Sequence, residues 1–338
     1  MKADVTPKDR MSRFLSGQPV DRTPVVPLIL NHSARVLGVK VSEYATSGST
    51  MGRAHVAAYH RYGQDLITIF GDTCILAEAM GTRLHFPDDD VPRVAAPFVV
   101  EPSDVDRISP VDVRAAGRLP VYLEAIRRCV AEVGSDVFVS CCLPAPFSNA
   151  AALRGTAALA RDTYKNPGLA RALLEKSLDV LCDMSEAVVE AGGIPVLVDP
   201  VASGSVLSRK AFETFVLPYL VAAFTKIRSL GMPPILHICG RTSAVVDLMA
   251  GCGAIALSVD QIPIKEARER TGGRVCLMGN VRPAETLLGG TPEMVRAEAA
   301  VCLADGRDNP AGFILATGCE VPIETPPENI DALINSVR

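Results

Sequence analysis

PILHICG, residues 234–240, is an apolar and β-branched run that begins at proline and ends at glycine, which is the pattern of a buried strand. The same pattern occurs before it, at IPVLVDP (194–200), and after it, at AIALSVD (254–260). The segment 209–229, which separates the first two runs, has the periodicity of an amphipathic helix. Strand, helix and strand in this order predict a parallel sheet.

The strand pattern extends outward until it accounts for the whole chain. Five further runs bring the total to eight: VVPLIL (25–30), DLITIFGD (65–72), VFVSCCL (137–143), VCLMGNV (275–281) and FILATGC (313–319). Eight strands that alternate with helices predict an α/β fold, a (β/α)8 TIM barrel. We expect a single barrel domain over residues 1–338, with the stretch 85–121 as an excursion between the second and third strands.

Helical patterns are clearest at 168–191, 209–229 and 292–304. The last of these has Thr291 as its predicted N-cap and Pro292 at its first position. Gly306 is predicted to lie just past its end, as glycine commonly does at the C-terminus of a helix.

The composition of the chain excludes several classes of function. Its formal net charge is −4, with no basic stripe of the kind that binds nucleic acid. The polar N-terminus and the lack of a membrane-length apolar run predict a cytoplasmic protein without a membrane span. Its ten cysteines are therefore expected to be thiols or metal ligands rather than disulfides. The core must be aliphatic, because only 5% of the residues are aromatic.

The ends of the predicted strands carry the candidate site, because the active site of such a barrel lies at the C-terminal ends of its strands. His237 and Cys239 alternate along one strand and therefore point to the same side. Cys319 ends the last strand, so the barrel would bring it to the same central cavity despite its distance in sequence. One imidazole and two thiolates predict a zinc site with an open fourth position.

Other strand-end residues have a functional and a structural interpretation. Asp72, Asp199 and Asn280 are the candidate catalytic residues. Asp199, Asp260 and Asn280 would either orient His237 through its second ring nitrogen or cap the helices that follow them.

Glycines and glutamates beside the same strand ends complete the candidate site. Gly240, Gly279 and Gly318 would let a cofactor approach the backbone closely at the barrel mouth. Glu78 and Glu320 are candidates for the fourth zinc ligand, with a position on the surface as the alternative.

The remaining histidines and cysteines are predicted to be structural. Cys141 and Cys142 are adjacent and face opposite sides of their strand, so they cannot both enter a cavity and are interpreted as packing residues. Six others are predicted to fill apolar space: Cys74, Cys129, Cys182, Cys252, Cys276 and Cys302. Four histidines without a ligand-type neighbour are predicted at surface or cap positions: His32, His55, His60 and His85.

Four stretches resemble the uroporphyrinogen decarboxylase superfamily, and the resemblance covers essentially the whole chain. They are TPKDRMSRFLSGQPVDRTPV (6–25), DPVASGSVLSRKAFETFVLPY (199–219), LHICG (236–240) and MGNVRP (278–283). The His-x-Cys pair with a late Cys is similar to that of the zinc- and corrinoid-dependent branch, typified by the methylcobamide:coenzyme M methyltransferases. This resemblance implies the same barrel, with His237, Cys239 and Cys319 as the zinc ligands.

The same resemblance leaves decarboxylation open as an alternative activity. Decarboxylases of the superfamily carry an arginine-rich stretch after the first strand, which binds the carboxylates of the porphyrinogen. The corresponding LILNHSARVLG contains only Arg35, which argues against porphyrinogen binding. Asp72, in FGD, resembles the essential aspartate of the decarboxylases, and its alternative role is to cap the following helix.

The methyltransferase resemblance implies a mechanism and partners. Zinc would hold a small thiol such as coenzyme M as a thiolate, which attacks the methyl group of a methyl-Co(III) corrinoid. The corrinoid implies a carrier protein that docks at the barrel mouth. The direction of transfer stays open, because some members instead demethylate methyl ethers, methylamines or halides onto Co(I). A non-catalytic tetrapyrrole-binding protein is a further alternative.

Overall fold

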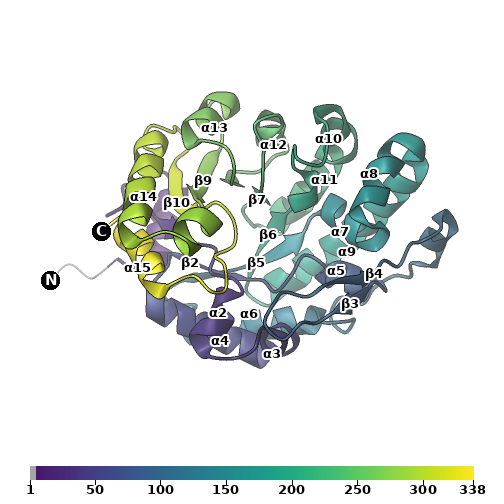
Figure 1. Cartoon of the computed structure of the whole chain (residues 1–338), viewed down its shortest axis with the longest axis horizontal. Helices are drawn as coiled ribbons and strands as arrows, with labels where there is room; N and C mark the ends of the chain where they lie inside the picture. The colour runs from purple at the N-terminus through teal and green to yellow at the C-terminus, as the bar shows by residue number, and fades with distance from the viewer. Residues whose placement is uncertain (1–4) are drawn as a thin grey trace.

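The computed structural model describes residues 5–338 and confirms the predicted (β/α)8 TIM barrel. Eight parallel strands form one sheet in the order β1-β10-β9-β8-β7-β6-β5-β2, and helices surround it (Figure 1). These strands are β1 (Val25–Val26), β2 (Leu66–Ile69), β5 (Phe138–Pro144), β6 (Ile194–Val198), β7 (Ile235–Ile238), β8 (Ala256–Val259), β9 (Cys276–Val281) and β10 (Phe313–Thr317). Each of them falls within or overlaps one of the predicted runs.

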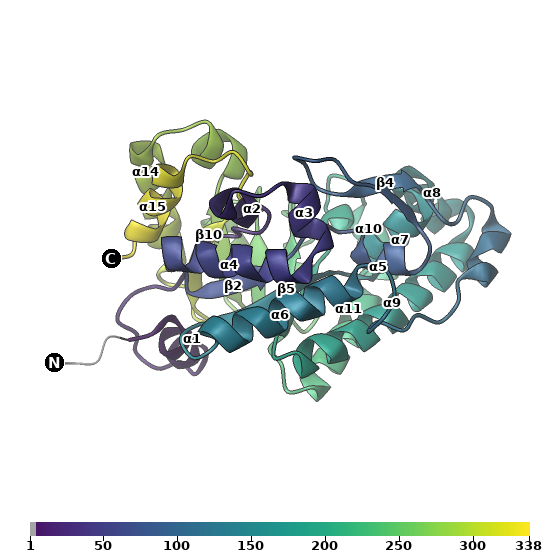
Figure 2. The ribbon, with the colours of Figure 1, turned by 90° about the horizontal axis from the view of Figure 1, so that it is seen from below.

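Helices alternate with the strands and cover the outside of the barrel. The α-helices are α1 (Pro7–Leu15), α2 (His32–Leu37), α3 (Val41–Thr46), α4 (Gly48–Tyr62), α5 (Ile75–Ala79), α6 (Leu119–Val133), α7 (Pro146–Arg154), α8 (Thr156–Lys165), α9 (Pro167–Glu190), α10 (Arg209–Phe215), α11 (Leu217–Ser229), α12 (Val246–Gly251), α13 (Ile264–Thr271), α14 (Pro292–Gly306) and α15 (Pro327–Asn335). Shorter turns are η1 (Pro102–Arg107), η2 (Pro200–Ala202) and η3 (Pro283–Leu288). Neighbouring helices pack side by side, as α4 and α6 do in Figure 2. Among residues 5–338, no helix has both the length and the apolar character needed to cross a membrane.

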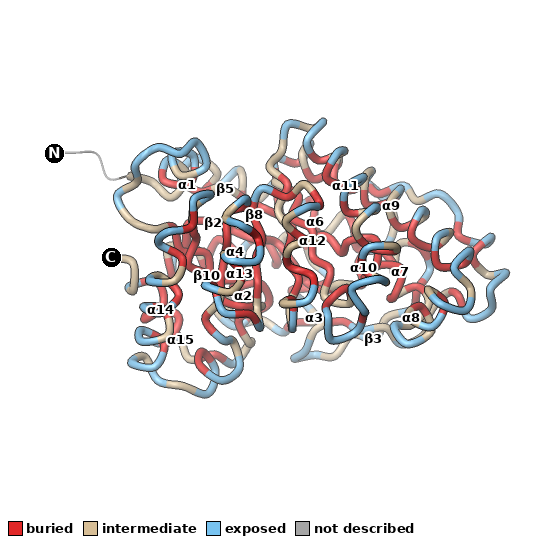
Figure 3. Tube along the Cα trace, turned by 90° about the horizontal axis from the view of Figure 1, so that it is seen from above, coloured by how far each residue is buried: buried red, intermediate tan, exposed pale blue. Residues whose placement is uncertain are grey.

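Alternate strand residues divide the core into an outer and an inner part. Val25 and Leu277 belong to the large cluster between the strands and the helices, whereas Val26 and Met278 face the inside of the barrel. Both sides are buried, which explains why the strands are apolar throughout rather than alternating with polar residues. Figure 3 shows the buried strands at the centre and exposed residues on the outer helices.

Two helix boundaries differ from the prediction. The helix expected at 209–229 is divided at Val216 into α10 and α11, because Pro218 cannot donate a helical hydrogen bond. Thr291 caps α14 as predicted, since its side chain accepts a hydrogen bond from Met294 N. Gly306, however, is the last residue of α14 and does not lie past it. The ring of Phe313 occupies the place where a side chain at Gly306 would stand, so close packing explains this glycine.

The excursion predicted at 85–121 lies between β2 and β5. The antiparallel hairpin of β3 (Arg83–His85) and β4 (Arg93–Ala96) begins two residues before the predicted start, and η1 follows it. The loop at the tip of this hairpin includes Val91 and Pro92, which line the cavity described below. The excursion therefore contributes part of the wall of that cavity.

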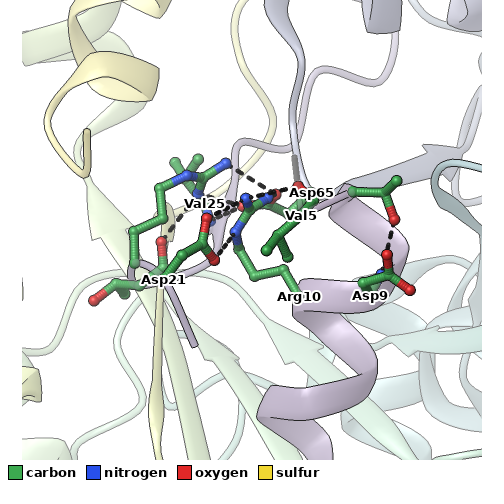
Figure 4. A network of polar contacts seen from close by, with 9 residues as sticks. Val5, Asp9, Arg10, Asp21, Val25 and Asp65 are labelled. Atoms are coloured by element: carbon green, nitrogen blue, oxygen red, sulfur yellow. Dashed lines mark hydrogen bonds and ion pairs between the residues drawn. The ribbon is translucent and has the colours of Figure 1, made fainter. Parts of the chain in front are cut away.

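A buried ion cluster joins β1 to β2 at the N-terminal end of the barrel (Figure 4). Asp65 N donates to Val25 O over 3.0 Å, and Val25 N donates to Asp65 Oδ2 over 2.7 Å. The same carboxylate accepts from Arg10 Nη1 and from Arg22 Nη1, each over 2.7 Å. Arg10 comes from α1, which covers this end of the barrel. Asp65 thus links the first and last strands of the sheet order.

Two of the histidine predictions were wrong. His32 and His55 are buried in the helical layer, not at the surface, whereas His60 and His85 are exposed as expected. His32 Nε2 lies 2.9 Å from the Tyr62 hydroxyl, and His55 Nε2 lies 2.8 Å from the Tyr44 hydroxyl. These tyrosine partners satisfy the imidazoles inside the core. All ten cysteines lie within the described residues, and each is free of a disulfide bond.

Candidate metal centre

His237, Cys239 and Cys319 converge at the C-terminal end of the barrel. His237 is on β7 and Cys239 directly follows it, whereas Cys319 follows β10. One ring nitrogen and the two sulfur atoms all lie within 4.8 Å of one another. The strands β8 and β9 separate β7 from β10 in the sheet, so the curvature of the barrel brings the two cysteines together.

The spacing of these atoms fits a tetrahedral zinc ion. Zinc–sulfur bonds of about 2.3 Å and zinc–nitrogen bonds of about 2.0–2.1 Å place tetrahedral ligand atoms roughly 3.5–3.8 Å apart. The group therefore needs only a small contraction to close on an ion. His237 is buried, and both cysteines are partly exposed, so the group remains accessible from the mouth of the barrel.

The imidazole of His237 is oriented by Ser258 on the neighbouring strand. Ser258 is paired with His237 in the register of β7 and β8, and its hydroxyl lies 3.0 Å from His237 Nδ1. This contact leaves Nε2 as the ring nitrogen that is free to bind a metal. Neither propensity nor spacing marked Ser258 in the sequence, although AIALSVD was correctly predicted as a strand.

The two sulfur atoms interact directly with each other. A hydrogen bond from Cys319 lowers the pKa of Cys239, while donating that hydrogen bond and burial raise the pKa of Cys319. Cys239 is therefore the more acidic of the two thiols. A divalent cation would stabilise both as thiolates, and its binding would release protons.

Asp260 connects the loops that carry the two cysteines. Its Oδ2 accepts from Gly240 N over 2.7 Å, directly after Cys239. The carboxylate also packs against Gly318, where an added Cβ would lie 2.6 Å from Asp260 Oδ1. Gly240 has a φ of +74°, a left-handed conformation that favours glycine. Gly240 and Gly318 therefore contact Asp260, and neither glycine lines the cavity.

Asn280 and Gly279 lie on β9 beside the same loops. Asn280 Nδ2 donates to the backbone oxygen of Asp260 over 2.7 Å and to that of Ile262 over 2.5 Å. An added Cβ at Gly279 would lie 2.8 Å from Val259 O, so this residue allows close strand packing. Neither residue lines the cavity, and their observed contacts support the loop after β8.

Asp199 follows β6 and is fully buried. Its Oδ1 accepts from the backbone N and the hydroxyl of Ser148, over 2.8 and 2.6 Å, at the start of α7. Burial raises the pKa of Asp199 to about 7. Asp199 does not line the cavity. It contacts the first turn of α7, which precedes it in the chain, and not the helix that follows it, as the capping interpretation expected.

A cavity of about 200 Å³ extends from the metal group into the barrel. Its deeper wall is aliphatic and includes Val26, Leu66, Val196, Ile235 and Met278. Its polar side chains at the C-terminal end include His237, Cys239, Cys319, Asp72 and Glu320. Cys142 lines this cavity and Cys141 packs outside the strands, which confirms that they face opposite sides.

The two candidate fourth ligands lie in different surroundings. Glu320 lines the cavity, where its Oε1 accepts from Asn31 N over 3.0 Å and from Asn31 Nδ2 over 2.8 Å. Burial raises the pKa of Glu320 to about 7. Glu78 accepts instead from Arg118 Nε over 2.8 Å and is not among the cavity-lining residues.

Arg118 is a site residue that the sequence analysis missed. It lies at the start of α6, and its Nη2 is 2.9 Å from Asp72 Oδ2, while its guanidinium stacks over the ring of Phe86. Burial raises the pKa of Asp72, and the charge of Arg118 partly offsets this effect. Asp72 Oδ1 also accepts from Cys74 N over 2.8 Å, ahead of α5. Arg118 carries no sequence signal, since an arginine before a helix is common on surfaces.

Three comparisons with known proteins agree with this architecture. The chain is 30% identical to the methylcobamide:CoM methyltransferase MtaA of Methanosarcina barkeri (strain Fusaro / DSM 804), covering 98% of this chain and 97% of the relative. It is 31% identical to the uroporphyrinogen decarboxylase of Anaeromyxobacter dehalogenans (strain 2CP-C), covering 96% and 98%. The solved structure of a methyltransferase from Methanosarcina mazei superposes with a TM-score of 0.90 at 29% identity, covering 98% of both chains.

The predicted family is confirmed by a family model as well as by these relatives. The model described as uroporphyrinogen decarboxylase (URO-D) matches residues 6–338, which is nearly the whole chain. Because that match and the near-complete coverage of the relatives agree with the barrel, the chain belongs to the uroporphyrinogen decarboxylase family.

Proposed function

We propose that this chain is a zinc-dependent methyltransferase that moves a methyl group between a corrinoid on a carrier protein and a small thiol. The observation that carries the proposal is the convergence of His237, Cys239 and Cys319 within 4.8 Å beside an open cavity. Three protein ligands with a free fourth position are typical of catalytic zinc, whereas structural zinc normally has four. The similarity to methylcobamide:CoM methyltransferases supports the same assignment.

The bound metal would supply the means to keep the acceptor sulfur deprotonated near neutral pH. Ser258 fixes the ring of His237, and Asp260 fixes the loops of both cysteines, so the ligand atoms stay in place as the acceptor enters. The aliphatic wall of the cavity excludes water from the acceptor. A less hydrated sulfur is a stronger nucleophile.

The transfer itself is a displacement at carbon. The acceptor sulfur donates an electron pair to the methyl carbon, the sulfur–carbon bond forms and the cobalt–carbon bond breaks. The cobalt keeps the bonding pair and changes from methyl-Co(III) to Co(I), while the thiol proton leaves to solvent. The protein contributes proximity and orientation, because the corrinoid carrier must present the methyl group at the C-terminal mouth of the barrel.

Decarboxylation of a porphyrinogen is the second candidate, and Asp72 favours it because its carboxylate lines the cavity. The charges around Asp72 disagree with that activity. Among the described residues, no lysine or arginine lines the cavity, and Arg118 is paired with Asp72 and Glu78. Arg35 forms an ion pair with Glu324. A substrate with many carboxylates would therefore meet no free cation in this cavity.

The proposal is tested with purified protein, zinc analysis and free methylcobalamin. We expect about one zinc per chain and loss of the methylcobalamin spectrum when a small thiol is added. The same preparation should release no detectable carbon dioxide from uroporphyrinogen. Decarboxylation that continues after zinc removal would reject the methyltransferase assignment. Methylation of Co(I) by a methyl ether or a methylamine, without reaction of any thiol, would reverse the proposed direction.

A further inference from the structure

We propose that the methyl acceptor of this chain is a thiol with a short neutral hydrocarbon substituent. The cavity would discriminate against thiols that carry an anionic group, such as the sulfonate of coenzyme M. This inference rests on the proposed function, because it assigns the acceptor of the same reaction. It departs from the acceptor named for the methyltransferase relatives, and it follows from the charges and walls of the cavity.

The walls of the cavity suit a hydrocarbon. Below the metal group, the inward residues of several strands are aliphatic: Val26, Leu66, Val196, Val198, Ile235 and Met278. A cavity of about 200 Å³ holds a short alkyl chain. Each methylene that leaves water for such a surface should tighten binding about fourfold.

The charges of the cavity oppose an anionic acceptor. Its two acidic lining residues are Asp72 and Glu320, and no lysine or arginine lines it among the described residues. Arg118, which lies behind Asp72, is already paired with two carboxylates, over 2.9 and 2.8 Å. A sulfonate two carbons away from the zinc-binding sulfur would lose its hydration without gaining a cation.

Two backbone donors near the mouth, at the starts of α2 and α5, are already occupied. Asn31 N, just before α2, donates to Glu320, and Cys74 N, just before α5, donates to Asp72. An incoming anion would have to displace a protein carboxylate from each of these donors. The protein's own carboxyl groups therefore take the hydrogen bonds of these two donors, which a sulfonate could otherwise accept.

The floor of the cavity sets the length of the substituent. Leu66, Ile235 and Met278 line this cavity and also a second one of about 410 Å³ at the N-terminal end of the barrel. These three side chains separate the two spaces. Shortening the flexible Met278 should join them and admit a longer alkyl chain.

The test compares ethanethiol, 1-propanethiol, 1-butanethiol, coenzyme M and cysteamine. Binding to zinc-loaded protein is measured by calorimetry, and reaction with free methylcobalamin is measured separately by absorbance. We expect ethanethiol to bind at least about tenfold more tightly than coenzyme M, with about fourfold gains per methylene until the floor is reached. Met278→Ala should shift the preferred length upward.

A pair of variants tests the role of charge. Glu320→Gln removes a carboxylate from the cavity wall. It should therefore reduce the ratio of the dissociation constants of coenzyme M and ethanethiol about tenfold at pH 8. Glu324→Gln is the matched control on the same segment, since its exposed side chain pairs with Arg35 outside the cavity. Glu324→Gln should leave the ratio of the two dissociation constants unchanged.

The outcomes distinguish an error in the inferred acceptor from an error in the proposed reaction. Tighter binding of coenzyme M or cysteamine than of ethanethiol would overturn the inference, even if methyl transfer occurs. Selective binding of neutral thiols without any methyl transfer would support the inferred binding preference and reject the proposed function. If no thiol binds the zinc-loaded protein, both are wrong.

Discussion

Replacing Ser258 with alanine should weaken zinc binding without disturbing the barrel. The Ser258 hydroxyl is buried and lies 3.0 Å from His237 Nδ1, and the two residues are direct neighbours in the register of β7 and β8. When Nε2 binds a metal, Nδ1 carries the proton and donates it to this hydroxyl. Alanine removes the acceptor and leaves the ring N–H buried and unpaired.

Two independent estimates give the same size of effect. A buried donor that loses its partner costs about 1–3 kcal/mol. Removing a group that orients a metal-binding histidine typically lowers metal affinity about 10–100-fold, which corresponds to about 1.4–2.7 kcal/mol. We therefore expect the zinc dissociation constant of Ser258→Ala to rise about 10–100-fold, and Ser258→Thr to restore most of the affinity because it keeps the hydroxyl.

Competition with a chromophoric zinc chelator measures this dissociation constant directly. The matched control is Ser140→Ala, because Ser140 is an equally buried hydroxyl on β5 that donates to Ile67 O over 3.0 Å, away from the metal group. It should lower thermal stability to a similar degree and leave zinc affinity unchanged. The orienting role of Ser258 would be refuted if Ser258→Ala kept its zinc affinity, or if Ser140→Ala lost as much zinc affinity as Ser258→Ala.

Three further outcomes are expected. Cys239→Ala and Cys319→Ala should each lose stoichiometric zinc by elemental analysis and keep the circular dichroism of the folded barrel, because the site lies beyond the packed strands. Asp65→Asn should lower the free energy of unfolding by about 3–5 kcal/mol in urea, since two arginines lose a buried partner, whereas Asp21→Asn at a more exposed ion pair should cost less than about 1 kcal/mol. Burial lowers the pKa of His55 from 6.5 to about 3, so the unfolded state binds more protons between those values and stability falls as the pH drops through this window. The native protein should therefore lose about 2 kcal/mol more than His55→Gln between pH 7.5 and pH 5 in urea titrations; equal losses would contradict this assignment.

The strands and their end residues were predictable because a buried parallel strand has a strong local signature. Each run is short, apolar on both faces and bounded by turn residues, and all eight runs were found as strands. Once the barrel is accepted, its geometry brings together the ends of β7 and β10. This is why His237, Cys239 and Cys319 could be proposed as one group from sequence, although two strands separate them.

The side-chain partners could not be predicted, because they depend on contacts between segments far apart in sequence. Arg118 gains its importance only when the chain beyond the β3–β4 hairpin returns to Asp72. His55 was expected at a surface or cap position, because no local sequence pattern indicates that the Tyr44 hydroxyl is its hydrogen-bond partner inside the core. Gly306 is the last residue of α14, where the ring of Phe313 on β10 leaves no room for a side chain. Local patterns contain none of these distant contacts.

The four consecutive strands β7, β8, β9 and β10 act as one structural unit for the metal group. The outer two carry the ligands, while β8 supplies Ser258 and leads into Asp260, and Asn280 on β9 holds the backbone of Asp260. A slip of one residue between β7 and β8 would turn His237 toward the outer helices and remove the metal group. Zinc affinity is therefore a sensitive measure of strand register in this half of the barrel. By contrast, the Asp65 cluster joins β1 to β2 at the opposite end and should affect stability without changing zinc affinity.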